Sequence, residues 1–141
     1  MAAELIYHAQ IYIKKWQADA IIPVPLHIGK YRKRGYNQAE IIANEIAALA
    51  NIPVINDVLF RKRNTRAQKH FGKEKRRKNL EDAFYADEKK LKKYMAEMSV
   101  KRVIIVDDIY TTGSTINACA KILRQTGIES YFITMCIGDG F

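Results

Sequence analysis

A short stretch near the C-terminal end, residues 102–115, constrains the fold more than any other part of the chain. Residues 103–106 are four consecutive apolar residues, which is typical of a parallel strand buried on both faces. Two adjacent carboxylates, Asp107 and Asp108, follow and are expected to end the strand. A hydroxyl-rich turn comes next, and then a helical pattern whose expected apolar face is Ile116, Cys119, Ala120 and Leu123. The order is therefore strand, acidic pair, hydroxyl loop, helix.

The hydroxyl loop, residues 111–115, suits a phosphate group. A helix N-terminus offers unpaired N–H groups and the positive end of the helix dipole. Gly113 would let the backbone approach an anion closely, and the neighbouring hydroxyls can donate. Since two carboxylates would repel a phosphate, we expect them to face the vicinal hydroxyls of a sugar, with a magnesium ion nearby. An ordinary capped helix would explain one hydroxyl, but not two acids and a glycine in this order.

The positive charge of the chain is concentrated in one segment. The net charge is +9, and residues 61–79 contain ten Lys or Arg and one acid, so the remainder is balanced at 14 basic and 14 acidic residues. Such a local excess favours an anionic partner at that place. We interpret residues 61–79 as a mobile basic flap that orders over pyrophosphate or a larger polyanion; a disordered loop without function is the alternative.

A length of 141 residues is enough for a core, and we expect a single domain over residues 1–141. No apolar run approaches the roughly 20 residues of a membrane span, and no signal peptide is visible, so we expect a cytoplasmic protein without membrane insertion. Cys119 and Cys136 are expected to pack in the core. A helix begins almost at Met1 without a clear cap, which suggests that the chain begins inside a longer natural protein.

Apolar periodicity predicts an α/β fold with a mainly parallel sheet flanked by helices and a β-hairpin, residues 53–85, inserted with the flap at its tip. We expect Tyr12 and Leu49 to lie on the inward faces of their helices, and the last strand to be well covered. The expected helices are 3–17, 37–50 and 87–98, and the expected strands are 19–24, 53–60, 80–85, 103–106 and 130–137.

A basic cluster, Lys30, Arg32, Lys33 and Arg34, follows the end of the first strand. Open α/β sheets place their ligands at that edge, so the cluster could bind one, although most charge runs are simply solvated.

Residues 103–115 resemble the motif that binds phosphoribosyl pyrophosphate (PRPP) in type I phosphoribosyltransferases: four apolar residues, two acids, a short loop and Thr-Gly-x-Thr. The resemblance implies that Asp107 and Asp108 hold the ribose hydroxyls and reach Mg²⁺ indirectly, through PRPP or water. It assigns the 5′-phosphate to Thr111, Thr112, Gly113, Ser114 and Thr115. Purine-base transferases usually carry an acid at the position of Thr111, so purine salvage is disfavoured and the acceptor stays open.

Two further motifs resemble the ComF family, phosphoribosyltransferase-like proteins associated with competence for DNA uptake. They are Pro-Val-Pro-Leu-His at 23–27 with Arg-x-Arg-Gly-Tyr-Asn-Gln at 32–38, and a second signature on Arg61, Arg63, Thr65, Gln68, Arg77, Asn79, Ala83 and Phe84. With the PRPP motif the resemblance covers roughly residues 3–137. Many family members carry a cysteine-rich zinc-binding segment before the first helix, and this chain has none.

The resemblance implies displacement of pyrophosphate from the ribose, a step that needs fixed positive groups and Mg²⁺ at the leaving group. The expected catalytic residues are Asp107, Asp108, Arg61 and Arg63. The expected pyrophosphate contacts are Val24, Pro25, Leu26, Arg32 and Arg34. The acceptor or the rest of the pocket is assigned to Tyr36, Asn37, Gln38 and Tyr110.

Two alternatives to a transferase remain open. One is a PRPP- or nucleotide-binding domain without catalysis, since the same motif would serve it. The other is a single-stranded nucleic-acid binder that uses residues 61–79, with Tyr36 and Phe71 available for stacking on bases.

Overall fold

A three-stranded parallel sheet forms the centre of the protein. The structure, a computed structural model, describes residues 2–62 and 82–137, with side chains for 8–62 and 82–135. The sheet has the order β1 (Ala20–Pro23), β4 (Arg102–Tyr110), β5 (Glu129–Ile137). A parallel bridge between Ile21 and Val54 extends the β1 edge. The predicted α/β class with a mainly parallel sheet is confirmed.

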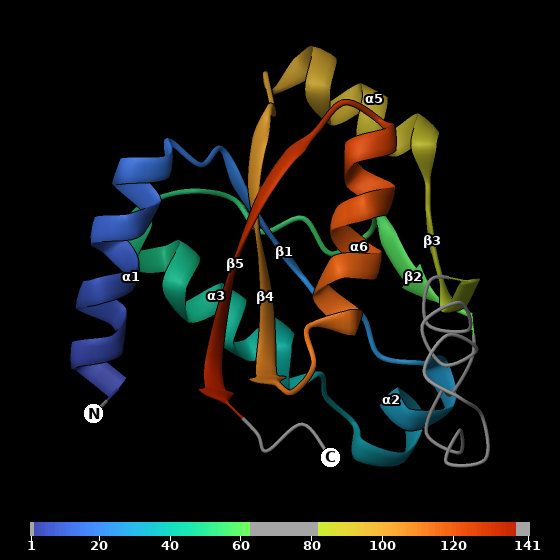
Figure 1. Cartoon of the computed structure of the whole chain (residues 1–141), viewed down its shortest axis with the longest axis horizontal. Coiled ribbons are helices and arrows are strands. Elements are labelled where there is room, and N and C mark those ends of the chain that lie inside the picture. Colours follow the sequence, from blue (N-terminus) through green and yellow to red (C-terminus); the bar gives the residue numbers. More distant parts are fainter. Residues whose placement is uncertain (1, 63–81, 138–141) are drawn as a thin grey trace.

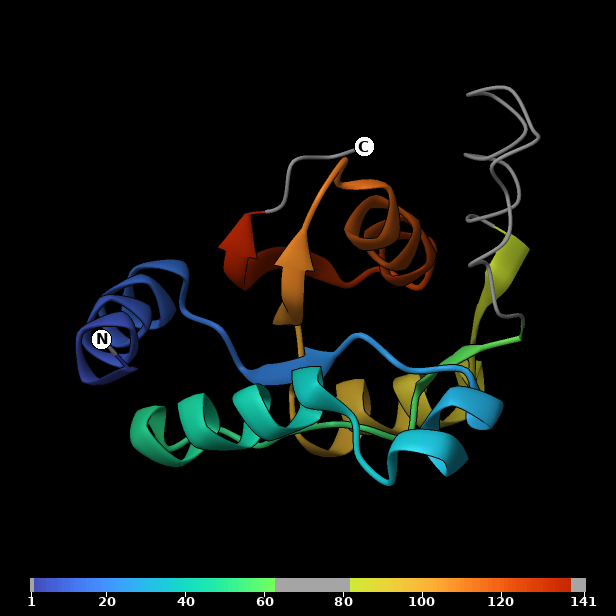
Figure 2. The same cartoon turned by 90° about the horizontal axis from the view of Figure 1, so that it is seen from below.

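Helices cover both faces of this sheet (Figures 1 and 2). The helices α1 (Ala2–Trp16) and α3 (Gln38–Ala50) contribute to the core on one face. On the other face the core contains residues of α5 (Glu88–Glu97), α6 (Ser114–Gln125) and an antiparallel hairpin of β2 (Leu59–Arg61) and β3 (Phe84–Ala86). None of the helices in the described part of the chain is long and apolar enough to cross a membrane.

Strand β4 is the part of the sheet that both cores share. Val103, Ile104, Ile105 and Val106 are all 0% exposed. Because side chains alternate along a strand, Val103 and Ile105 enter the core beside α5 and α6, while Ile104 and Val106 enter the core beside α1 and α3. The prediction of a strand buried on both faces is confirmed.

The expected end of this strand at Val106 is wrong. β4 continues through the acidic pair to Tyr110, because β5 still offers it partners: Asp107 pairs with Thr134, and Tyr110 pairs with Ile137. The acids therefore have the fixed backbone of a strand rather than that of a loop.

Three expectations about burial and strand length are also wrong. Phe132 and Met135 on β5 are 46% and 38% exposed, because β5 is the last strand of the sheet in the described part of the chain and its outer residues have less to pack against. Tyr12 and Leu49, at the margins of their helices' apolar faces, are also about half exposed. The strand expected at 53–60 forms only the bridge at Val54 and the first residues of β2.

A short helix, α2 (Ile28–Arg34), was not predicted. It has no buried residue, and its two large apolar residues, Ile28 and Tyr31, are too few to establish an apolar period. Its local signals are its two ends: the His27 side chain accepts a hydrogen bond from the Gly29 N–H at 3.2 Å, and Gly35 ends the helix with φ +78°. The basic cluster is thus presented on a helix.

Candidate functional site

The motifs singled out in the sequence meet around one hollow of about 270 Å³. Its lining comes from the residues that follow β1, the end of β4 and α2. Figure 1 shows the end of β4 and α2 at the lower side of the molecule. Open α/β sheets place ligands at this edge. We call it the site hollow; its lining is Val24, Pro25, Leu26, Lys30, Arg34, Asn37, Gln38, Ala39, Arg61, Asp107, Asp108, Ile109, Thr111 and Thr115.

The chain leaves β1 in a conformation that two hydrogen bonds hold. The Val24 N–H donates to the carbonyl of Val106 at 2.8 Å, and the Val24 carbonyl accepts from Nδ2 of Asn37 at 3.1 Å. Oδ1 of Asn37 accepts from the Ala39 N–H at 3.0 Å and thereby caps α3. Val24, Pro25 and Leu26 consequently stand along the wall of the site hollow in a fixed arrangement.

The acidic pair occupies the floor at the end of β4. Burial raises the pKa of Asp107 to about 7, and its interaction with the Asp108 side chain adds to the effect, while the Asp108 backbone N–H and the Arg61 cation oppose it. Oδ1 of Asp107 also accepts from the Asp108 N–H at 2.9 Å. At neutral pH the Asp107 side chain is therefore partly protonated. Carboxyl groups with such shifted pKa values are common where a protein binds or transforms a ligand.

Arg61 reaches the site hollow from β2. Its guanidinium carbon lies 5.1 Å from the centre of the Phe84 ring, a cation–π arrangement that positions the side chain. Burial lowers its pKa, and the nearby Cys119 and Asp107 act in the opposite direction. Arg61 and Asp107 are thus electrostatic neighbours contributed by the hairpin and the sheet.

Cys119, on the other hand, belongs to the core. It is 0% exposed, and burial raises the pKa of its thiol to about 12, so the thiol stays protonated. The prediction that Cys119 packs in the core is confirmed, whereas the side chain of Cys136 lies outside the described ones.

The hydroxyl loop leads into α6 through a glycine that the geometry requires. Gly113 has φ +81°, and a Cβ there would lie 2.5 Å from the hydroxyl of Tyr110. Oγ1 of Thr112 lies 2.8 Å from Oγ of Ser114 and accepts from the Ser114 N–H at 3.3 Å. The N-cap residue of α6, Gly113, has no side chain that could cap the helix, and Thr111 and Thr115, close to this N-terminus, line the site hollow.

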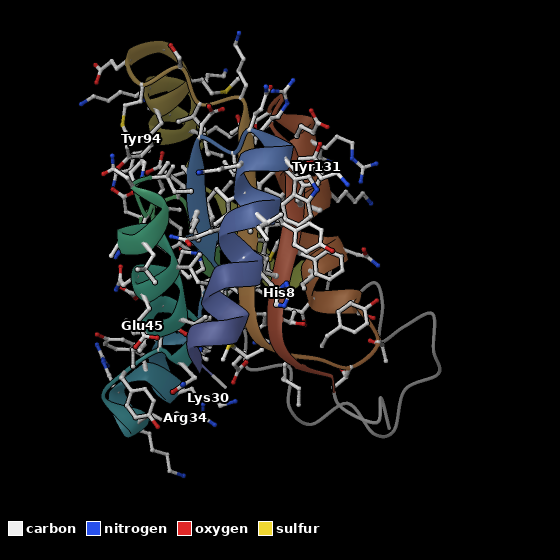
Figure 3. The ribbon with its side chains drawn as sticks, turned by 90° about the vertical axis from the view of Figure 1, so that its left-hand side faces the viewer. His8, Lys30, Arg34, Glu45, Tyr94 and Tyr131 are labelled. Carbon is white, nitrogen blue, oxygen red and sulfur yellow. The ribbon has the colours of Figure 1, made fainter. Side chains whose placement is uncertain are left out.

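Helix α2 contributes two cationic side chains to the lining of the site hollow. Lys30 and Arg34 line the site hollow from α2, and Figure 3 shows them at the end of the molecule remote from Tyr94. Lys30 was part of the basic cluster but was not among the predicted site residues. The arginine expected beside it, Arg32, is exposed and outside the lining.

The remaining predicted residues divide into three groups. Thr112, Gly113 and Ser114 shape the loop without lining the hollow. Tyr36 is 47% exposed outside the lining, and Tyr110 stacks on Phe132 with ring centres 5.5 Å apart. Arg63 and the flap beyond Lys62, together with the part of the second signature between 63 and 81, lie outside the described residues.

The donor set suits a magnesium ion that is shared with a ligand. Within residues 2–62 and 82–137, no group of three or more His, Cys, Asp or Glu could hold a metal by itself. Mg²⁺ commonly binds through one or two carboxylates and completes its shell with water and phosphate oxygens. Asp107 and Asp108 are two such carboxylates at one edge of the sheet, so the residues present fit the ion.

Two larger hollows, of about 420 and 380 Å³, lie elsewhere. The first lies between the hairpin and α6, with Lys62, Asp82 and Lys121 in its lining, and the second lies beside the start of β5. Neither contains the acidic pair or the hydroxyl loop. The site hollow is therefore a candidate because of the side chains that meet in it and not because of its volume.

Comparison with known families agrees with this geometry. The phosphoribosyl transferase domain family matches residues 10–138. The chain belongs to this family. The match spans both strands that end at the site hollow, the hairpin and α6.

Curated relatives support the narrower resemblance to ComF proteins. Competence protein F of Haemophilus influenzae is 39% identical over 111 residues, which are 79% of this chain and 46% of the relative. The DNA utilization protein YhgH of Salmonella typhi is 31% identical over 111 residues, 77% of this chain and 44% of the relative. The predicted ComF membership is confirmed, and the chain spans less than half the length of these relatives.

A solved structure shows the same fold at greater distance. The purine phosphoribosyltransferase of Pyrococcus horikoshii superimposes with a TM-score of 0.54 at 15% identity, covering 98% of this chain and 73% of that one. The predicted type I phosphoribosyltransferase fold is confirmed by this likeness, which concerns the fold alone.

We predict that Asp107→Asn stabilises the protein at neutral and alkaline pH. The folded-state pKa of Asp107, about 7, lies above its ordinary value of 3.8, so the penalty for ionising it is absent below about pH 4 and grows as the pH rises to about 7. Because Asp107 is only partly buried, we expect a gain of roughly 1–2 kcal/mol at pH 8. Urea unfolding at pH 4 and pH 8 measures the difference, with Asp82→Asn on the surface as control. A gain that is equal at both pH values would contradict the account.

Proposed function

We propose that this domain binds PRPP with Mg²⁺ and transfers its phosphoribosyl group to an acceptor with release of pyrophosphate. The single observation that carries the proposal is the composition of the site hollow. An acidic pair, the N-terminal end of α6 and three cations, two from α2 and one from β2, line one space of about 270 Å³. These are the partners that a sugar diol, a terminal phosphate and a pyrophosphate require.

In this proposal each part of PRPP is bound by a different group of residues in the site hollow. Ionised Asp107 and Asp108 accept hydrogen bonds from the ribose 2′- and 3′-hydroxyls. The backbone and hydroxyls of the hydroxyl loop bind the 5′-phosphate at the N-terminus of α6. Lys30, Arg34 and Arg61, together with the backbone of residues 24–26, stabilise the negative charge that grows on the departing pyrophosphate. Bound Mg²⁺ would neutralise part of that charge.

The relatives place such a domain in proteins named for competence and DNA utilization. We therefore propose that the protein takes part in DNA uptake or in the use of imported DNA. Since the chain spans less than half of those relatives, this assignment concerns the whole protein rather than the domain alone.

The binding claim is tested by calorimetric titration of PRPP with Mg²⁺ into the parent and into the double variant Asp107→Ala/Asp108→Ala. Hydrogen bonds to charged groups contribute about 1.5–3 kcal/mol each, so we expect the double variant to bind about 100-fold more weakly or worse. Asp82→Ala, which removes a carboxylate outside the site hollow, should bind like the parent. Absence of binding by the parent, or equal binding by the double variant, would reject the proposal.

Catalysis is tested separately, because a binding protein could use the same hollow. We expect pyrophosphate to be released from PRPP only when a suitable acceptor is present. Arg61→Met should slow the release at saturating PRPP, because methionine is similar in length to arginine but carries no positive charge. A coupled pyrophosphate assay over nucleobases, amines and pyridine carboxylates measures this. Tight binding of PRPP with no release for any acceptor would favour a sensor or scaffold without catalysis.

A second candidate function is binding of single-stranded DNA through residues 61–79, because the whole basic excess of the chain lies there. Phosphate contacts release counterions, so affinity should fall by about 10³-fold or more between 50 and 200 mM salt if six or more phosphates are contacted. Fluorescence anisotropy with an oligonucleotide measures this slope. A variant with Lys69, Lys73, Lys75 and Lys78 changed to Gln should show a smaller dependence of affinity on salt concentration. An affinity of the parent that does not change with salt concentration would exclude this function.

A further inference from the structure

Asn37 has the only polar side chain classed as buried in the described part of the chain, at 8% exposure. Its Nδ2 donates to the Val24 carbonyl at 3.1 Å, and its Oδ1 accepts from the Ala39 N–H at 3.0 Å. A carbonyl cannot donate and an N–H cannot accept, so these two partners determine which way the amide points. Both functions of the amide are thus used inside the protein.

The hydrogen bond from Asn37 to Val24 joins the two ends of residues 24–37, a segment that we call the excursion. The partners are 13 residues apart, and the segment between them contains α2 with Lys30 and Arg34. α2 has no buried residue, so the burial of its own side chains contributes little to its position. The base of the excursion is therefore an important determinant of where its two cations lie.

Val24 is held from both sides. Its N–H donates to Val106 on β4 at 2.8 Å, and its carbonyl is bound by Asn37 at the start of α3. Pro25 follows with restricted φ, so the direction of the chain through residues 24–26 depends strongly on these two bonds. Removing the Asn37 donor would leave the Val24 carbonyl without its bond, and the wall of the site hollow would have to move to satisfy it.

We propose that Asn37 is a positioning residue for the pyrophosphate end of the site. It holds the backbone of residues 24–26 and, through the excursion, the α2 cations in the arrangement that receives a pyrophosphate. This role rests on the proposed function and replaces the acceptor contact that the sequence suggested for Asn37. The 5′-phosphate end depends instead on the hydroxyl loop and α6, whose hydrogen bonds do not involve Asn37.

The test compares three ligands on the parent, Asn37→Asp and Asn37→Ser. Both variants keep an oxygen that can cap α3, but neither keeps the amide N–H that binds Val24. The ligands are PRPP with Mg²⁺, pyrophosphate with Mg²⁺, and ribose 5-phosphate, which lacks the pyrophosphate. Asp87→Ala is the matched control, because Asp87 caps the distant α5 through the Lys90 N–H at 3.1 Å.

We expect Asn37→Ser to bind PRPP and pyrophosphate about tenfold more weakly, as for the loss of one hydrogen bond, while its ribose 5-phosphate affinity changes by less than about twofold. Asn37→Asp should bind PRPP and pyrophosphate more weakly still, because it also adds a negative charge at the site hollow. Amide resonances of Leu26 and His27 should shift in the ligand-free variants, and those of Thr112 and Gly113 should not. Asp87→Ala should lower thermal stability without changing the ratio of the affinities.

Equal losses for all three ligands, or unchanged PRPP affinity, would overturn the role of Asn37 while leaving PRPP binding by the parent intact. Amide resonances at residues 26 and 27 that stay in place would overturn it without reference to any ligand. If the parent protein binds neither PRPP nor pyrophosphate, both the proposed function and the positioning role of Asn37 are overturned. This outcome is seen in the titrations of the parent and needs no variant.

Discussion

The burial of β4 on both faces is the constraint on which the rest of the structure depends. Val103 to Val106 have no exposed surface, and they alternate between the core beside α1 and α3 and the core beside α5 and α6. Shifting the strand by one residue would exchange the two sets of side chains, so the register is strongly specified. The same register determines where the acids emerge. Asp107 and Asp108 follow the last fully buried residue, at the edge where β1 also ends and α6 is about to begin.

The site places polar groups close to that core, and the energetic cost is visible at Asp107. Burial raises its pKa to about 7, although Arg61 stands nearby and favours the ionised form. A ligand hydroxyl or a cation at this position would favour the carboxylate and offset part of the cost. Asn37 illustrates the opposite solution, because its buried amide is satisfied entirely by backbone groups and holds the wall of the hollow in place. In the proposed function Asp107 faces a ligand, whereas the hydrogen bonds of Asn37 stay within the protein.

Much of the site could be predicted from local order along the chain. A buried strand, two acids, a glycine and a helix start follow one another in the sequence, so their proximity at Asp107, Gly113 and Thr115 needs no long-range information. The rest could not be predicted in this way. The seven-residue helix α2 is too short to produce an apolar period, so neither the helix nor which members of the basic cluster line the hollow could be predicted. The exposure of Phe132 depends on β5 being an edge strand, which its apolar sequence does not reveal. The role of Asn37 depends on a partner 13 residues away, Val24.

The most direct test of the central claim, that one hollow binds a phosphorylated ribose at one end and pyrophosphate at the other, is amide chemical-shift mapping with separate ligand fragments. Ribose 5-phosphate should shift resonances in residues 107–115, pyrophosphate with Mg²⁺ should shift Val24, Leu26 and those of α2, and PRPP with Mg²⁺ should shift both sets. Shifts confined to the hollow between the hairpin and α6, or shifts from both fragments at the same residues, would contradict the account.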